Sequence, residues 1–199
     1  MAIYHNNKKI VKIYHGNIPI TRSYHGGILI YKEFNILDYN LLTNSDLLID
    51  SNSDGVPDGF AYSVATTDKT LVNGIAKFTA TAKDGNFYKS NTNTNIIGNK
   101  YYHYAKVKAS NSNVRLYVLN PSTSDYHSGS GSFEYLSLIT EPTTINDNIF
   151  ILDNNLSNWT PIEVDYVGAI NITDLVSRGI LPSGLTNEQY KTLLDSLIQ

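Results

Sequence analysis

Tyr101-Tyr-His-Tyr-Ala-Lys-Val-Lys-Ala109, followed after Ser110-Asn-Ser-Asn113 by Val114-Arg-Leu-Tyr-Val-Leu119, is the stretch that most clearly indicates the fold. Successive side chains of a strand point to opposite faces. One face of these two runs is apolar and carries Ala105, Val107, Val114, Leu116 and Val118. The other face carries Tyr102, Tyr104, Lys106, Arg115 and Tyr117. We therefore predict two strands with the apolar set in the core and the tyrosine set outside.

Runs of the same kind occur on both sides of this pair. They are short, rich in β-branched or aromatic residues and separated by Gly, Asn, Asp, Ser and Pro; they span residues 74–82, 132–139, 148–152 and 162–172. Short strands at this spacing, without long helical periodicity, favour an antiparallel sandwich. We predict an all-β chain in which residues 35–176 form a jelly-roll β-sandwich.

The last segment, residues 177–199, has a different pattern. Thr186-Asn-Glu-Gln189 is a capping box, in which the Thr and Gln side chains satisfy each other's backbone donors. Apolar residues then recur at helical spacing, at Tyr190, Leu193, Leu194 and Leu197. We predict a linker and one short amphipathic helix that lies against the sandwich.

Residues 1–34 contain three near-copies of a ten-residue phrase. In each copy Tyr-His precedes a two-residue turn, which is Asn6-Asn7, Gly16-Asn17 or Gly26-Gly27. Asn and Gly tolerate the positive φ that such hairpin turns require, so we predict a small β-meander. A few bare strands are marginally stable in water. We therefore expect this segment to be an anchor that attaches to other proteins or to copies of itself.

Composition excludes several classes of function. The net charge of −3 provides no basic surface for nucleic acid. Cysteine is absent, so disulfides and thiolate metal sites are excluded. No run approaches the length of a membrane span, and the N-terminus lacks the apolar segment of a signal peptide. We expect no nucleic-acid partner and no membrane insertion. A surface-protein composition without an export signal is what a virion component made in the host cytoplasm would have; the alternatives are a chain trimmed of its signal peptide and a cytosolic protein.

Two further stretches resemble known proteins. Asp50-Ser-Asn-Ser-Asp-Gly-Val-Pro-Asp-Gly-Phe60 is similar to the opening loop of carbohydrate-binding jelly rolls. The segment from Glu163 to Leu175, followed by Thr186-Asn-Glu-Gln-Tyr190, resembles the end of such domains in bacteriophage tail and baseplate proteins. The N-terminal repeat also looks like the short β repeats that begin many phage structural proteins. The resemblance implies a phage tail, baseplate or fibre protein with a carbohydrate-binding jelly roll.

The Asp50–Asp58 loop also has the ligand spacing of a calcium site. Calcium binds six to eight oxygen atoms, and acidic or amide side chains around a glycine turn can supply them. The candidate ligands are Asp50, Asn52, Asp54, the carbonyl of Val56, and Asp58. The position that holds the bidentate acid of an EF-hand is Ala61, so this is no EF-hand. The alternative is a turn in which Asp and Asn bond their own backbone without an ion.

Aromatic residues are the candidates for sugar binding. Aromatic rings stack on sugar faces, and polar side chains bond the hydroxyl groups. The candidate glycan contacts are Tyr102, Tyr104, Arg115 and Tyr117 on the strands, with Tyr126 and Trp159 in loops. The alternative is an ordinary solvated sheet face, since tyrosines also pack across strands and lysines keep sheets soluble.

Other site types have weaker support. His5, His15 and His25 occupy equivalent repeat positions and could bind a transition metal, but repetition alone also explains them. No nucleophile, zinc or phosphate-loop motif of an enzyme is present. Two acids among Glu134, Asp147 and Asp153 could form the catalytic pair of a glycosidase, which requires only two carboxyl groups at a fixed separation. We expect no enzymatic activity.

The combined prediction is a non-enzymatic bacteriophage virion protein. The jelly roll would bind a host surface polysaccharide, residues 1–34 would contact other virion proteins, and a homo-oligomer is expected, with a trimer favoured from the resemblance to phage fibres. One alternative is a purely structural subunit whose jelly roll binds proteins. Another is a cell-surface glycan-binding module.

Overall fold

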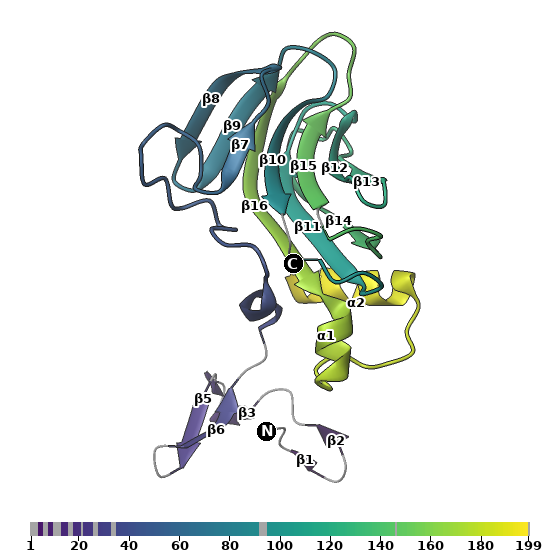
Figure 1. Ribbon diagram of the computed structural model, residues 1–199. Helices are drawn as coiled ribbons and strands as arrows, with labels where there is room; N and C mark the ends of the chain where they lie inside the picture. Colours follow the sequence, from purple (N-terminus) through teal and green to yellow (C-terminus); the bar gives the residue numbers. More distant parts are fainter. Residues whose placement is uncertain are drawn as a thin grey trace. The chain divides into compact units, whose positions relative to one another are not determined.

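The computed structural model describes residues 35–91, 95–145 and 147–198, and before them the backbone of residues 4–5, 8–9, 13–15, 18–20, 22–25 and 28–32. The chain forms two compact units, residues 1–38 and residues 39–199. Figure 1 shows both units with most of their elements labelled.

Each N-terminal repeat forms its own hairpin. The strands are β1 (Tyr4–His5), β2 (Lys8–Lys9), β3 (Ile13–His15), β4 (Ile18–Ile20), β5 (Arg22–His25) and β6 (Ile28–Lys32). They pair as β1-β2, β3-β4 and β5-β6, with His5 opposite Lys8, His15 opposite Ile18 and His25 opposite Ile28. Two residues thus separate the paired ends, at the predicted turn positions, which lie outside the described residues. The described strands form three separate two-stranded sheets. They differ in this from the predicted meander, in which strands of neighbouring repeats would also pair.

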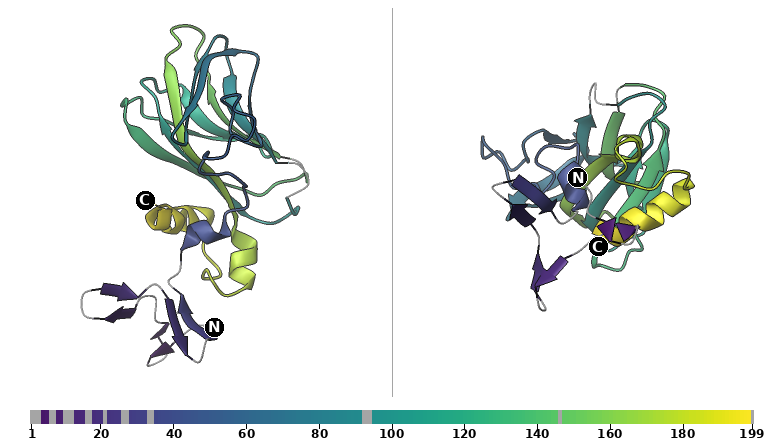
Figure 2. Two further views of the ribbon diagram at one scale, coloured as in Figure 1. Left: turned by 90° about the vertical axis from the view of Figure 1, so that its left-hand side faces the viewer. Right: turned by 90° about the horizontal axis from the view of Figure 1, so that it is seen from below.

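The second unit is an antiparallel sandwich of two five-stranded sheets, which confirms the predicted fold class. A single-turn helix, η1 (Ile36–Tyr39), precedes it, and its strands are β7 (Phe60–Tyr62), β8 (Thr66–Val72), β9 (Ile75–Ala80), β10 (Gly85–Asn91), β11 (Tyr101–Lys108), β12 (Val114–Val118), β13 (Thr123–Tyr126), β14 (Phe133–Thr140), β15 (Asp147–Asp153) and β16 (Pro161–Asn171). We call the sheet of order β13-β12-β15-β10-β7 the front sheet, and the sheet of order β14-β11-β16-β9-β8 the back sheet. Figure 2 shows the sandwich in two further views.

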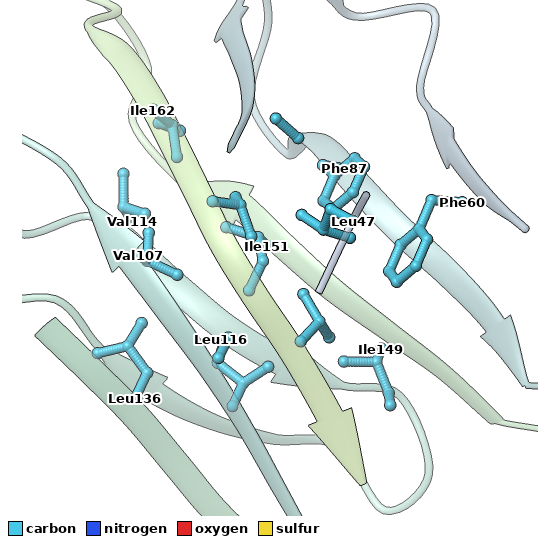
Figure 3. Close-up of a cluster of buried hydrophobic side chains, with 14 of the residues drawn as sticks. Leu47, Phe60, Phe87, Val107, Val114, Leu116, Leu136, Ile149, Ile151 and Ile162 are labelled. Atoms are coloured by element: carbon cyan, nitrogen blue, oxygen red, sulfur yellow. The ribbon is translucent and has the colours of Figure 1, made fainter. Parts of the chain in front are cut away.

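The core lies between the two sheets. Ala105 and Val107 of β11 and Leu116 and Val118 of β12 are fully buried there, so the predicted register is confirmed. Figure 3 shows Val107 and Leu116 in one cluster with Ile149 and Ile151 of β15. Period-two alternation places one apolar set per strand in this layer. The outer face of the front sheet is thereby left to its polar and aromatic side chains.

Two helices follow the last strand, where one was predicted. α1 (Ile172–Ser177) begins directly after β16, and its N-cap Asn171 accepts a hydrogen bond from the backbone of Asp174. Six residues are too few for a helical period to be recognised in the sequence. α2 (Asn187–Ile198) begins at the predicted capping box, where Thr186 and Gln189 exchange hydrogen bonds. Tyr190 and Leu194 of α2 are buried, whereas Leu197 is 42% exposed.

α2 packs on the outer face of the back sheet beside β14. The hydroxyls of Tyr102 (β11) and Ser137 (β14) both donate to Oδ1 of Asp195, each at 2.6 Å. Tyr102 is therefore fully buried, although it points away from the core. Tyr104 is fully buried as well, with its ring stacked on those of Tyr102 and Tyr166 and packed over Gly168. The interpretation of Tyr102 and Tyr104 as exposed glycan contacts is wrong, because α2 covers Tyr102 and the neighbouring strand β16 packs against Tyr104.

Candidate functional site

The outer face of the front sheet carries four aromatic side chains from four adjacent strands. In register, Tyr88 of β10 lies opposite Phe150 of β15, and Phe150 lies opposite Tyr117 of β12. Ring centroids are 5.6 Å apart for Tyr88 and Phe150, and 5.8 Å apart for Phe150 and Tyr117. Tyr126 of the edge strand β13 extends the series. We call Tyr88, Phe150, Tyr117 and Tyr126 the aromatic row.

The row is open to solvent to different degrees. Tyr126 is 50% exposed, whereas Tyr88, Phe150 and Tyr117 are half-buried. The tilted ring pairs support one another across the strands, which is the usual way in which cross-strand aromatic pairs stabilise a sheet. The hydroxyl of Tyr117 shares a 3.2 Å hydrogen bond with that of Ser122. The result is an ordered aromatic strip that crosses the strands.

Arg115 of β12 lies between Tyr117 and Tyr126. Its guanidinium carbon is 5.0 Å from the ring centre of Tyr117 and 5.6 Å from that of Tyr126. Nη1 donates to the Tyr126 hydroxyl at 3.0 Å and to Ser124 Oγ at 3.3 Å. The front sheet therefore combines aromatic rings with a cation held in one position.

The structure unites half of the predicted glycan contacts. Arg115, Tyr117 and Tyr126 meet on one face, whereas Tyr102 and Tyr104 are buried on the other sheet. Trp159 lies in the 154–160 connection after β15 and is half-buried.

Tyr88 and Phe150 were missed by the sequence analysis. Phe150 could have been found, because the predicted strand 148–152 alternates Ile149 and Ile151 inward with Phe150 outward. Tyr88 belongs to β10, a strand that the sequence analysis did not recognise.

The candidate calcium ligands lie in a turn in which their side chains accept hydrogen bonds from backbone N–H groups of the same turn. Asp50 accepts from the backbone N–H of Asp54 and Gly55, and Asp54 accepts from that of Val56. Asn52 donates to Asp54 and accepts from its N–H.

The last acid of this loop is held in the same way. Asp58 accepts from both the backbone and the hydroxyl of Ser51, and the hydroxyl bond, more than the backbone bond, lowers the pKa of Asp58. Across the described parts of the chain, no group of three or more His, Asp or Glu side chains could hold a metal ion.

This arrangement agrees with the ion-free Asx turn that the sequence left open. Calcium at Asp50, Asn52, Asp54, Val56 and Asp58 stays a prediction. A melting temperature that rises in millimolar calcium relative to chelator would support it, since a ligand of the folded state stabilises that state. An unchanged melting temperature would remove it.

Among the acidic candidates, Glu134 and Asp153 each bond to their own local partners. Glu134 accepts from Ser128 and Ser130, whose hydroxyl hydrogen bonds lower its pKa to about 2. Asp153 is fully buried and accepts from Asn111 and from the N–H of Asn155. The side chains of Asp147 and of His5, His15 and His25 lie outside the described residues.

Among the helices that the structure describes, none has the length and apolarity needed to cross a bilayer.

Comparison with known proteins identifies the fold. No family model and no curated protein matches the sequence. A structure of an arabinose-bound GH51 α-L-arabinofuranosidase aligns with a TM-score of 0.53 at 13% identity, over 78% of this chain and 29% of that protein. At this level of identity the likeness concerns the fold alone.

Carbohydrate-binding modules and a phage protein are among the other matches. A CBM4 module aligns with a TM-score of 0.49 at 17% identity, over 65% of this chain and 98% of the module. The enzymatically active domain of tailspike protein 4 from bacteriophage CBA120 aligns with a TM-score of 0.45 at 14% identity, over 67% of this chain and 22% of that one.

Proposed function

We propose that this protein is a non-enzymatic bacteriophage virion protein that binds polysaccharide on the outer face of its front sheet. The aromatic row is the observation that carries the proposal. Its rings lie on neighbouring strands, so an oligosaccharide laid across the strands would meet one ring after another. Aromatic faces and a few fixed polar groups are the usual components of a sugar site.

The mode of action is adhesion through many weak contacts. A half-buried row on one open sheet offers modest contact area to a single chain. Copies of the protein on one particle would bind the same polysaccharide together, and linked sites raise the overall affinity without new contacts.

Several sequence features support the virion part of the proposal. They are the repeated N-terminal hairpins, which need a partner surface, and the resemblance of residues 1–34, 163–175 and 186–190 to phage structural proteins. The same front sheet would serve a cell-surface glycan-binding module. Detection of the chain in purified phage particles by mass spectrometry separates these two roles.

The glycan site is tested by binding to an array of polysaccharides at high valency, followed by substitution of the row. We expect Tyr117→Ala and Phe150→Ala each to weaken binding at least about fivefold, the loss that marks an energetically important contact. Tyr135→Ala is the matched control, because Tyr135 is a half-buried tyrosine of β14 in the other sheet. Binding to no glycan, or equal effects of all three substitutions, would contradict the proposal and favour a purely structural subunit.

A further inference from the structure

We infer that the glycan bound by the front sheet carries negatively charged groups and that Arg115 recognises them. This inference rests on the proposed function and adds the substrate class, an acidic polysaccharide. Arginine suits this task because its planar guanidinium presents N–H donors that match carboxylate and phosphate oxygens.

The guanidinium of Arg115 is held before any ligand arrives. Tyr117 and Tyr126 contact it through their rings, and Ser124 and Tyr126 accept hydrogen bonds from its Nη1. The side chain is 19% exposed. A long side chain fixed in this way loses little conformational freedom when it binds, so its position favours recognition.

The charge of Arg115 is not neutralised by a close ion pair within the protein. Asp84, in the turn before β10, is the acid that the structure brings near it, and Oδ1 of Asp84 lies 3.8 Å from Nη2. That distance is too long for a hydrogen bond, and the Asp84 side chain is 51% exposed. An ion pair whose acid is exposed and which lacks a hydrogen bond is weak. In addition, the buried Nε of Arg115 has no hydrogen-bond partner.

On the described strands of the front sheet, Arg115 is the basic residue whose side chain lies on the outer face. Lys89, the other basic residue on the described parts of the front-sheet strands, is buried and donates to the backbone carbonyl of Thr43. Nη2 of Arg115 is therefore the group through which this face would receive an anion. The anion would take the place of Asp84 beside the guanidinium, between two rings of the aromatic row.

The test compares acidic polysaccharides with uncharged counterparts of the same sugar. Polygalacturonate and its methyl-esterified form differ in the carboxylate, and phosphomannan and mannan differ in the phosphate. We expect the intact protein to bind at least one acidic member about tenfold or more tightly than its neutral counterpart, with an affinity that falls as salt is added. The two pairs distinguish a carboxylate from a phosphate as the recognised group.

Substitutions assign that preference to Arg115. We expect Arg115→Gln to abolish the preference, and Arg115→Lys to keep part of it, because lysine retains the charge and loses the planar donors. Asp84→Asn should strengthen binding of the acidic polymer severalfold, since it removes the competing carboxylate. Lys77→Gln on β9 of the other sheet removes one positive charge at a distance and should change nothing.

The outcomes separate this inference from the proposed function. Equal binding of acidic and neutral members, or a preference that survives Arg115→Gln, overturns the inference and leaves glycan binding intact. An equal loss with Lys77→Gln indicates nonspecific attraction and also overturns it. No binding to any of the four polymers overturns it too, whereas the proposed function falls if the polysaccharide array is also negative.

Discussion

At the scale of single residues, the absence of a side chain at Gly168 makes room for the ring of Tyr104. Gly168 lies on β16 opposite Tyr104 of β11, and the two strands pair in register. A Cβ at this position would overlap the Tyr104 ring and lie 2.5 Å from its hydroxyl oxygen. Tyr104 is fully buried, with its ring stacked on Tyr166 at 5.6 Å, so the ring has little room to move.

We therefore predict that Gly168→Ala destabilises the sandwich by about 1–3 kcal/mol, the usual cost of overpacking. Urea unfolding of the purified variant measures the change. Gly98→Ala is an informative comparison, because no atom lies within 4 Å of a Cβ there, and its cost would come from its positive φ instead. If Tyr104→Ala does not relieve the effect of Gly168→Ala, the clash is not its cause.

His103 is expected to make the stability of the fold depend on pH. It is fully buried on β11, its Nε2 bonds Thr140 Oγ1 at 2.9 Å, and its Nδ1 has no partner. Burial lowers the pKa of His103 to about 3. In the unfolded chain the pKa is about 6.5, so between these values the unfolded state binds a proton that the folded state does not.

Stability should therefore fall as the pH is lowered below about 6.5, by up to about 1.4 kcal/mol per pH unit. Unfolding free energies between pH 7.5 and pH 5 test this, in a range where the carboxylates stay ionised. In His103→Gln, whose amide does not titrate, the slope of the unfolding free energy against pH should be smaller, because one fewer proton is taken up on unfolding. The same slope in both proteins would assign the pH dependence to other groups.

At the scale of elements, α2 is held on the back sheet by a partly buried polar contact. Asp195 accepts from Tyr102 and Ser137 across the interface and from Lys191 on its own helix. Desolvation raises the pKa of Asp195, but the hydrogen bonds from Ser137, Tyr102 and Lys191 together lower it below its ordinary value. The carboxylate is therefore the acceptor that joins the helix to β11 and β14.

Asp195→Ala should destabilise the protein by about 1–3 kcal/mol, because two buried hydroxyls lose their acceptor. Asp174→Ala on α1 is the matched control, since Asp174 makes an exposed salt bridge to Arg178 four residues later. Such an exposed pair is worth about 0.5 kcal/mol or less. Equal losses in urea unfolding would mean that the contact to the sheet contributes nothing beyond a surface ion pair.

At the scale of the whole molecule, the two units are expected to have separate tasks. The buried core is built from residues 42–169 and belongs to the second unit. The three hairpins of the first unit are two-stranded, and such hairpins are marginal when isolated. Their unpaired edges would be satisfied by partner strands, in a symmetric oligomer or on a particle.

Deletion of residues 1–34 should leave the melting temperature of the sandwich unchanged and abolish oligomerisation. Light scattering of the full and shortened chains measures the mass, and a trimer is the expected form of the full chain. An oligomer that persists after the deletion would transfer the assembly role to the sandwich. A strict monomer in both cases would leave attachment to other virion proteins as the role of the hairpins.

The sequence by itself determined the features that depend on neighbours along the chain. Alternation along residues 101–119 identified the core face, because a strand has a period of two residues whatever it packs against. The capping box located the start of α2, and the repeated turns located the hairpin ends, since both signals act within a few residues.

Only the tertiary structure decided what covers the outer faces. Tyr102 and Tyr117 follow the same strand pattern, yet Tyr102 is buried by a helix more than 80 residues later in the sequence and Tyr117 is not. In the same way, Tyr88, Phe150 and Tyr117 become neighbours through strand order in the front sheet. Alternation specifies the face to which a side chain points, but the element that docks on that face is determined by long-range packing, which no local pattern encodes.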